Sequence, residues 1–145
     1  MDATCYWRGG LAFEATNRQH STKMDAKPPF GKDQAPTPKE LLLNAICGCT
    51  AMDVVSYLRK KREEPTEFTI TAQTGVTSGH PSIFDHVQLI YKLSGQLNQT
   101  HVVEAVVKSM SLYCGVSAMV TKACPISYSI DLNGEIIGSG EALFP

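Results

Sequence analysis

From Leu41 to Leu58 the chain is apolar on nearly every side of a helix, and the stretch 37–62, TPKELLLNAICGCTAMDVVSYLRKKR, predicts a long helix. Thr37 and Glu40 stand at the N-cap and the third helical position, which makes a capping box. Pro38 occupies the first helical position, where a missing N–H costs nothing. A helix that is apolar on all sides is buried on all sides or lies in a membrane. Because Asp53 interrupts the apolar run and that run is short for a membrane span, we expect a central buried helix.

Alternation of apolar and polar residues marks most of the other segments as strands, and Asn133-Gly134 is a strong hairpin signal. The order of the elements is βββ-α-ββ-αα-ββ, with strands grouped in hairpins, so the predicted fold class is α+β with antiparallel sheets. With no linker long enough to divide it, the chain 1–145 is expected to form a single domain. Strands are predicted at 3–8, 11–16, 20–25, 67–77, 84–94, 126–132 and 135–139, and helices at 37–62, at 98–113 and from Cys114.

The central helix poses a packing problem. A helix with apolar residues on every face needs cover on every face, and one modest sheet covers only one of them. Two such helices packed back to back, each backed by its own sheet, would cover both sides. We therefore expect a homodimer.

The composition narrows the classes of partner. The net charge of −1 and the pI near 6.4 give no electrostatic footprint for nucleic acid or an anionic membrane, so a small or neutral substrate is expected. The first residues, MDATCYWRGG, show no basic segment followed by an apolar one, which favours a cytoplasmic protein over a secreted one. In that compartment the five cysteines, an odd number, are expected to be free thiols.

The cysteines carry the open chemical question. Cys49 lies in the middle of the long helix, where a free cysteine is most often a small buried hydrophobe, and it is too far from the helix N-terminus to be activated there. Cys114 lies where two helical pieces meet, so a helix N-terminus can stabilise its thiolate, and ordinary packing is the alternative. Cys47 and Cys49 point about 200° apart on a helix and cannot be bridged. We interpret Cys5 and Cys124 as packing residues.

The remaining candidates have ordinary structural interpretations. Cys47-Gly48-Cys49 lacks the spacing of zinc ligands, so no metal site is expected. Glu40 is expected to serve the capping box, and Arg8 to be solvated at a hairpin tip. Asp53 is different, because a buried carboxylate must be paired or protonated, and we expect it to hold the fold or a dimer together. The four histidines show no spacing that pairs one with a nucleophile.

Two segments together resemble a known family. PKELLLNAICGCTAMDVV, followed much later by SLYCGVSAMV, is similar to the OsmC/Ohr family, the osmotically inducible and organic-hydroperoxide-resistance proteins. The similarity is greatest to the divergent OsmC-like branch, and it covers essentially the whole chain. The resemblance implies an intertwined α+β homodimer with two active sites at the subunit interface.

Carried over residue by residue, the resemblance implies that Cys49 is the cysteine that attacks the peroxide and Cys114 the one that resolves it. Arg8 falls where the peroxidase branch has the arginine of its first hairpin. That branch has a glutamate directly after the proline that begins the helix, whereas this chain has Lys39 there and Glu40 one position later. It also tends to have proline after the second cysteine, where this chain has glycine.

The implied activity is that of an antioxidant thiol peroxidase, which reduces organic hydroperoxides to alcohols through a Cys49 sulfenic acid and a Cys49–Cys114 disulfide. The apolar surroundings of Cys49 would favour an alkyl or lipid peroxide. A cellular dithiol, such as a lipoyl group, would then reduce the disulfide, with no metal or organic cofactor. The alternative, from another class, is an OsmC-like dimer that binds a small apolar or thiol-reactive ligand in its interface pocket with little turnover. A third interpretation is a dimer whose thiols are simply buried.

Overall fold

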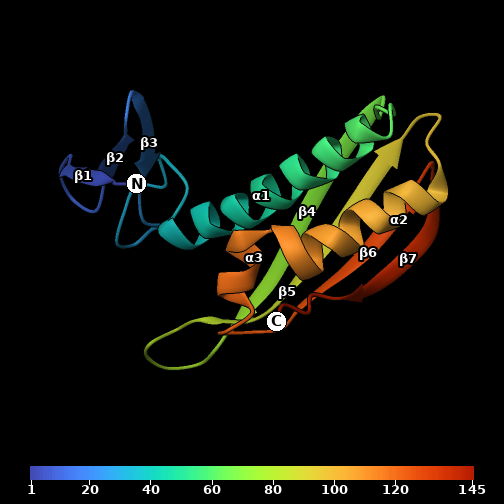
Figure 1. Ribbon diagram of the computed structural model, residues 1–145. Coiled ribbons are helices and arrows are strands. Elements are labelled where there is room, and N and C mark those ends of the chain that lie inside the picture. Colours follow the sequence, from blue (N-terminus) through green and yellow to red (C-terminus); the bar gives the residue numbers. More distant parts are fainter. The chain divides into compact units, whose positions relative to one another are not determined.

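The elements follow one another in the predicted order, with mixed α+β content (Figure 1). The computed structural model describes residues 1–145, and the contacts divide them into two compact units, Met1–Leu43 and Asn44–Pro145. The strands are β1 (Thr4–Trp7), β2 (Phe13–Asn17), β3 (His20–Met24), β4 (Glu67–Val76), β5 (Phe84–Ser94), β6 (Ile126–Leu132) and β7 (Glu135–Glu141). The helices are α1 (Pro38–Lys60), α2 (Gln99–Lys108), the π-helical turn η1 (Ser109–Tyr113) and α3 (Gly115–Val120).

The N-terminal unit is built on an antiparallel sheet in the order β1-β2-β3. Gly9 and Gly10 have positive φ angles of 99° and 56° in the turn after β1, a conformation that glycine adopts without steric cost. The loop after β3 is organised by the buried carboxylate of Asp25, which accepts N–H groups from Ala26, Lys32 and Gln34. A polar loop is thereby fixed around one side chain.

Helix α1 begins with the predicted capping box. The N–H of Thr37 donates to the Glu40 carboxylate over 2.8 Å, and the N–H of Glu40 donates to the Thr37 hydroxyl over 3.3 Å. These reciprocal bonds satisfy two N–H groups that have no partner inside the helix. The helix ends at Lys60, within two residues of the predicted boundary.

Within one chain, α1 is buried along a single stripe. Its fully buried residues recur at intervals of four: Ile46, Thr50, Val54 and Leu58. On another side Met52 is 73% exposed and borders an open groove of about 510 Å³, formed by residues 51–60 of the same helix. By length and composition α1 could also span a membrane, but its buried stripe packs into the core, as in the central helix of a domain. The cover on the remaining sides, and with it the homodimer, stays a prediction.

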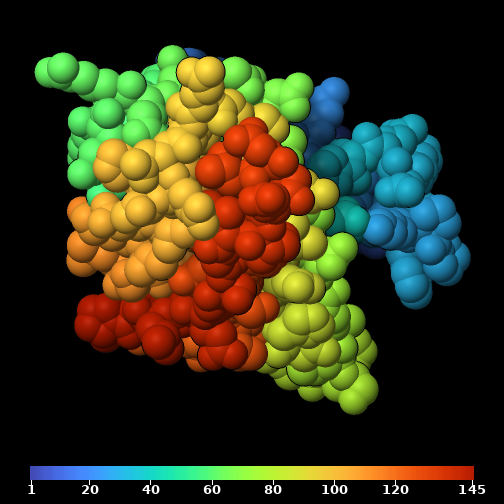
Figure 2. Space-filling model, turned by 90° about the vertical axis from the view of Figure 1, so that its right-hand side faces the viewer, coloured from blue at the N-terminus to red at the C-terminus, as the bar shows by residue number.

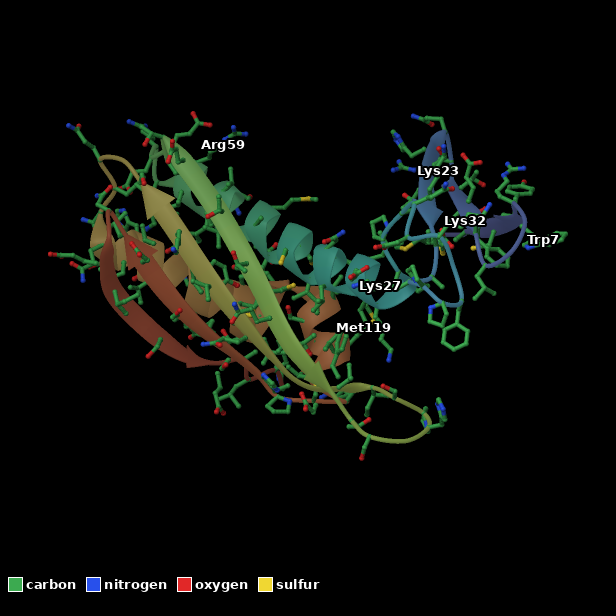
Figure 3. All side chains as sticks on the ribbon, turned by 180° about the vertical axis from the view of Figure 1, so that it is seen from behind. Trp7, Lys23, Lys27, Lys32, Arg59 and Met119 are labelled. Atoms are coloured by element: carbon green, nitrogen blue, oxygen red, sulfur yellow. The ribbon has the colours of Figure 1, made fainter.

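The C-terminal unit is a four-stranded sheet in the order β4-β5-β6-β7 with helices on one face. The other face carries no helix (Figure 3). The outer pairs are antiparallel, as predicted, but β5 and β6 are parallel, so the expectation of purely antiparallel sheets is wrong at the centre. The reason is the connection: α2, η1 and α3 carry the chain back across the sheet, which a parallel pair requires. From Val87 to Leu93 every second residue of β5 points into the core, among them Leu89 and Tyr91.

The second predicted helix, 98–113, is not α-helical throughout. Asn98 caps α2 by accepting two N–H groups, but the helix changes at Ser109 into a π-helical turn. The N–H of Cys114 donates to the carbonyl of Ser109 over 3.0 Å, five residues back. Such π turns are rare and concentrate at functional sites. Here the turn leaves Ser109 in the core and sets Cys114 as the N-cap of α3.

The C-terminal segment packs against this turn. Figure 2 shows the red C-terminal residues beside the orange helical segment, and the N–H of Leu143 donates to the carbonyl of Met110 over 3.1 Å. The N–H of Ala142, one residue earlier, donates to the carbonyl of Ile126 at the start of β6 over 2.8 Å. The end of the chain therefore ties the π turn to the sheet.

Candidate active site

One row of α1 side chains faces α2 and η1. Cys49, Asp53 and Tyr57 follow one another at intervals of four residues, which places them on one side of the helix. Tyr57 bonds to the Glu104 carboxylate of α2, and Asp53 accepts the Ser109 hydroxyl over 2.9 Å. The bond predicted for Asp53 thus exists within the chain, where it joins α1 to the π turn.

The two thiols selected from the sequence lie together. The sulfur atoms of Cys49 and Cys114 and a carboxylate oxygen of Asp53 all lie within 4.8 Å of one another. Cys114 reaches this position because the π turn ends directly before it, while Cys49 is presented from the middle of α1. Cys49 is half-buried and Cys114 is fully buried. The pair is therefore close enough to form a disulfide after small side-chain movements.

The thiol of Cys114 is held by its own helix. Its sulfur accepts the Ser117 N–H over 3.4 Å and lies 3.0 Å from the Ser117 hydroxyl. Burial raises the pKa of the Cys114 thiol to about 11; the bonds from Ser117 oppose this shift, and the nearby Cys49 thiol adds to it. The helix N-terminus therefore does donate to the Cys114 thiol, as the sequence indicated, but it does not bring the pKa below the ordinary value. Helix α3 is short, and removal from water outweighs its hydrogen bonds.

A buried chain of hydroxyls lies beside the thiols. The Thr50 hydroxyl lies 2.7 Å from the Tyr91 hydroxyl and 2.8 Å from the Ser109 hydroxyl. Because Ser109 uses its one proton toward Asp53, it accepts from Thr50, which in turn accepts from Tyr91. All donors thus point toward the Asp53 carboxylate. Burial raises the pKa of Tyr91, which keeps its hydroxyl protonated as the first donor of the chain.

The other cysteines lie apart from this pair. Cys47 lies beside the backbone of Ala72 on β4, so it points away from Cys49 as the helix geometry predicted. Burial raises the pKa of this thiol. Cys124 is buried, which agrees with packing at a helix end. Cys5 is exposed on β1, so the packing role predicted for it is wrong. Strand β1 is the edge of a small sheet with too little cover to bury it.

Arg8 and Glu40 both belong to the N-terminal unit, and there each has another partner. The Nε and Nη2 atoms of Arg8 lie 3.0 Å from a carboxylate oxygen of Glu14. Glu40 pairs with Lys27 over 2.7 Å and completes the capping box. The Lys27 ammonium, followed by the Thr37 N–H, lowers the pKa of Glu40 to about 2. Glu40 thus serves the cap, as its residue-level interpretation predicted, whereas Arg8 forms a surface ion pair at its hairpin and is not merely solvated.

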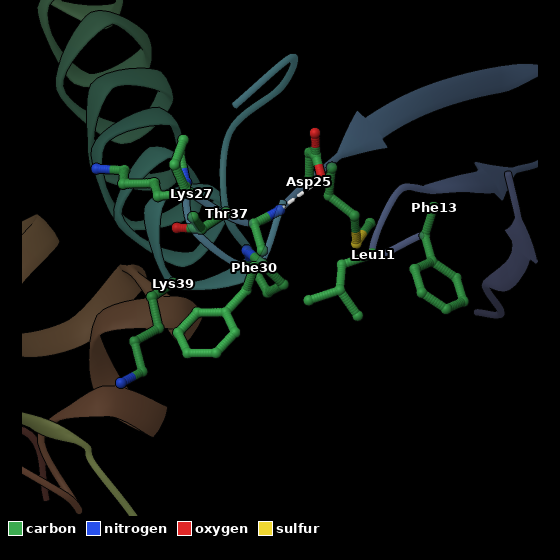
Figure 4. Close-up of a pocket in the computed structure, with 11 residues that line it drawn as sticks. Leu11, Phe13, Asp25, Lys27, Phe30, Thr37 and Lys39 are labelled. Carbon is green, nitrogen blue, oxygen red and sulfur yellow. Dashed lines mark hydrogen bonds between the residues drawn. The ribbon is translucent and has the colours of Figure 1, made fainter. Parts of the chain in front are cut away.

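The N-terminal unit has a pocket of its own. It has a volume of about 620 Å³ and lies between the hairpin and the loop after β3, with Leu11, Phe13 and Phe30 as apolar walls (Figure 4). Lys27 and Lys39 also line it. All of its lining residues belong to the N-terminal unit, and none of them is a cysteine.

The sequence did not single out all the residues around the thiols. Thr50 and Asp53 interrupt the apolar run of α1 next to Cys49. These two polar residues were the only sequence feature from which a polar cluster near Cys49 could have been predicted. Ser109 and Ser117 gave no signal, because serines are common near helix ends. Only the π turn, which no periodicity predicts, brings Ser109 into the core.

Comparison with known proteins agrees with this architecture. The family described as OsmC-like protein matches residues 31–129. Protein YhfA of Escherichia coli K12 is 33% identical over 134 residues, covering 91% of this chain and 98% of its own. A hypothetical protein from Aquifex aeolicus is 25% identical with a TM-score of 0.78, covering 91% of this chain and 96% of that one. An organic hydroperoxide resistance protein OsmC from Legionella pneumophila shares the fold at 15% identity, with a TM-score of 0.69 over 90% of this chain and 95% of that one. The family match and the YhfA match show that this chain belongs to the OsmC-like protein family.

Proposed function

We propose that this protein is a thiol peroxidase that reduces organic hydroperoxides to alcohols. The observation that carries the proposal is the closeness of the Cys49 and Cys114 sulfur atoms, which come from elements far apart in sequence. The exposure of the two thiols differs in a way that suits two roles. The half-buried Cys49 is accessible enough to react with the peroxide, and the fully buried Cys114 lies beside it as the resolving thiol.

In this cycle the Cys49 thiolate attacks the distal oxygen of R–O–OH. An S–O bond forms, the O–O bond breaks, and the leaving alkoxide takes up a proton to give the alcohol. Cys49 is left as a sulfenic acid. Cys114 then gives up its proton and attacks the Cys49 sulfur, so that an S–S bond forms, the S–O bond breaks and hydroxide leaves as water. A cellular dithiol returns both thiols by exchange.

Arg8 and Glu40 enter the proposal through the family resemblance. A guanidinium near Cys49 would stabilise the thiolate and the leaving oxygen. For that role Arg8 must leave Glu14, a surface ion pair of the kind that costs about 0–1 kcal/mol to break. Arg8→Ala should then slow the reaction of Cys49 with peroxide, while Glu14→Gln, which frees Arg8, should not slow it.

The second candidate is a dimer that binds a small apolar or thiol-reactive ligand with little turnover. The partners of Arg8 and Glu40, together with the raised pKa of Cys114, favour it, because none of these arrangements activates a thiol in advance. Peroxide turnover that depends on Cys49 would exclude this candidate.

The test is a single-turnover reaction. Reduced protein receives one equivalent of an alkyl hydroperoxide, a thiol-blocking reagent stops the reaction, and peptide mass spectrometry maps the disulfides. A Cys49–Cys114 bond that appears as fast as the peroxide disappears would support the peroxidase. If all five thiols stay free while the peroxide survives, the peroxidase proposal fails. Cys47→Ser is the matched control, since it removes a thiol of the same helix that points elsewhere.

A further inference from the structure

The cluster of Cys49, Asp53 and Cys114 has a second chemical capability. Two thiolates and a carboxylate are recognised ligands of Zn²⁺, and their donor atoms here lie within 4.8 Å of one another. We infer that the reduced protein binds a thiophilic divalent cation, Zn²⁺, through the Sγ atoms of Cys49 and Cys114 and a carboxylate oxygen of Asp53. This binding function is distinct from the proposed peroxidase and does not depend on it.

The distances are compatible with tetrahedral coordination. With Zn–S bonds of about 2.3 Å and a Zn–O bond of about 2.1 Å, neighbouring ligand atoms around zinc lie about 3.6–3.8 Å apart. The present spread of up to 4.8 Å therefore has to contract by about 1.2 Å at most. Rotation of side chains that stand on two different elements can supply that contraction without a change in the backbone.

Two of the ligands are already oriented by neighbouring donors. The Ser109 hydroxyl donates to Asp53 over 2.9 Å, and the Ser117 N–H donates to the Cys114 sulfur over 3.4 Å. Bonds of this kind fix the direction of metal-binding side chains and raise affinity. The buried Tyr91 and Thr50 hydroxyls hold Ser109 in turn, so the orientation of Asp53 rests on the core of the C-terminal unit.

The charge of the cluster also favours a bound cation. The hydrogen-bond partner of Asp53 within this unit is the neutral Ser109 hydroxyl, and the Lys108 ammonium of α2 donates to Tyr57 instead. Any thiolate formed beside Asp53 adds a like charge nearby, which is unfavourable in a site partly removed from water. A divalent cation reverses this balance: it displaces the protons of both thiols to solvent, forms two Zn–S bonds and one Zn–O bond, and leaves the fourth position to water.

The sequence could not indicate this site, because zinc motifs are read from pairs of ligands a few residues apart. Here only Cys49 and Asp53 are local, and Cys114 arrives through the π turn. Zinc bound at this position would also occupy the electron pairs of both thiols. In the metal-bound protein the Cys49 and Cys114 thiols should therefore react more slowly with electrophiles, whatever the physiological substrate is.

The test uses Co²⁺ as a spectroscopic probe of the reduced, full-length chain. One equivalent should give the visible bands of tetrahedral cobalt and a thiolate-to-cobalt charge-transfer absorption, and Zn²⁺ should displace it. Cys49→Ser and Cys114→Ser should each lower the charge-transfer absorption by about half, as one of two thiolates is lost. Asp53→Asn should weaken binding while keeping the charge-transfer absorption at saturation, and Ser109→Ala should weaken it roughly 10–100-fold. Cys47→Ser should bind like the unmodified protein.

A second measurement needs no variant and so does not depend on how the variants fold. The unmodified reduced protein is treated with a thiol-alkylating reagent with and without one equivalent of Zn²⁺, and the modified cysteines are mapped by mass spectrometry. Zinc should protect the half-buried Cys49 and leave the exposed Cys5 fully reactive, whereas the buried Cys114 should be modified little in either state. Protection of Cys5 or Cys47 instead, or an absence of charge-transfer absorption at micromolar Co²⁺, would overturn the inference. Neither readout involves peroxide, so a failed peroxidase assay leaves this result unaffected.

Discussion

The Ser109 hydroxyl donates to the carboxylate of Asp53 over 2.9 Å and joins the π turn to α1 across 56 positions of sequence. The same two elements carry Cys114 and Cys49. The bond therefore fixes the spacing of the thiol pair, because a shift of the turn along α1 would break it. It also gives Asp53 the hydrogen bond that a partly buried carboxylate requires.

Ser109→Ala tests this relationship. The substitution removes the donor to Asp53 and the acceptor for Thr50 at a site that is 0% exposed, so it should lower the free energy of unfolding by about 1–3 kcal/mol. Urea unfolding measures the change. Ser111→Ala is the matched control in the same turn, where the hydroxyl donates to the exposed carbonyl of Val107, and it should cost less than about 0.5 kcal/mol. Equal costs for both variants would contradict the role assigned to Ser109.

The cap of α1 should make stability depend on pH. The pKa of Glu40 is lowered to about 2 in the folded protein from an ordinary value of 4.5, so its contribution is complete above pH 4.5 and is lost as the pH falls toward 2. Thermal midpoints of the unmodified protein and of Glu40→Gln should therefore converge over that range. Lys27→Met, which removes the main cause of the shift, should move the loss to higher pH. Parallel curves down to pH 2 would count against the capping pair.

The open side of α1 predicts a homodimer that one polar substitution can disrupt. Met52 is 73% exposed on this side, and Met52→Glu would place a charge in an apolar interface. Sedimentation velocity should show a dimer for the unmodified protein and a monomer for the variant. Ile136→Glu, at a residue that is 67% exposed on β7, should remain dimeric. A monomeric unmodified protein at micromolar concentration would refute the prediction.

The two thiols should have separable roles in the proposed peroxidase. Cys114→Ser should consume one equivalent of hydroperoxide and then stop, with Cys49 trapped as a sulfenic acid that a selective reagent labels. Cys49→Ser should consume none. Mass spectrometry of the labelled peptide provides the measurement, and the assigned roles would have to be abandoned if both variants fail equally in the first turnover.

Most elements of the fold could be predicted because local signals agree with the final structure. The capping box at Thr37, the alternation in β4 and β5 and the turn at Asn133-Gly134 each specify a conformation within a few residues. The thiol pair could be named only through the family resemblance, because nothing local connects Cys49 with Cys114.

The remaining features depend on contacts between distant segments. The parallel pairing of β5 with β6 follows from the path of the intervening helices, and strand patterns do not encode a neighbour's direction. The π turn at Ser109 brings its hydroxyl to partners on α1, and no helical period in the sequence shows such contacts. The raised pKa of Cys114 likewise reflects burial, a property of the assembled core.

The parallel register of β5 and β6 also constrains the order in which the chain can fold. The hairpin of β4 and β5 can form as soon as both strands have left the ribosome, but β6 begins only at Ile126. Until then the inner edge of β5 has unpaired backbone groups and apolar side chains, the combination that promotes aggregation of nascent chains. We expect translation products that stop before β6 to be insoluble and those that extend past β7 to fold, because the centre of the sheet cannot close before β6 is available.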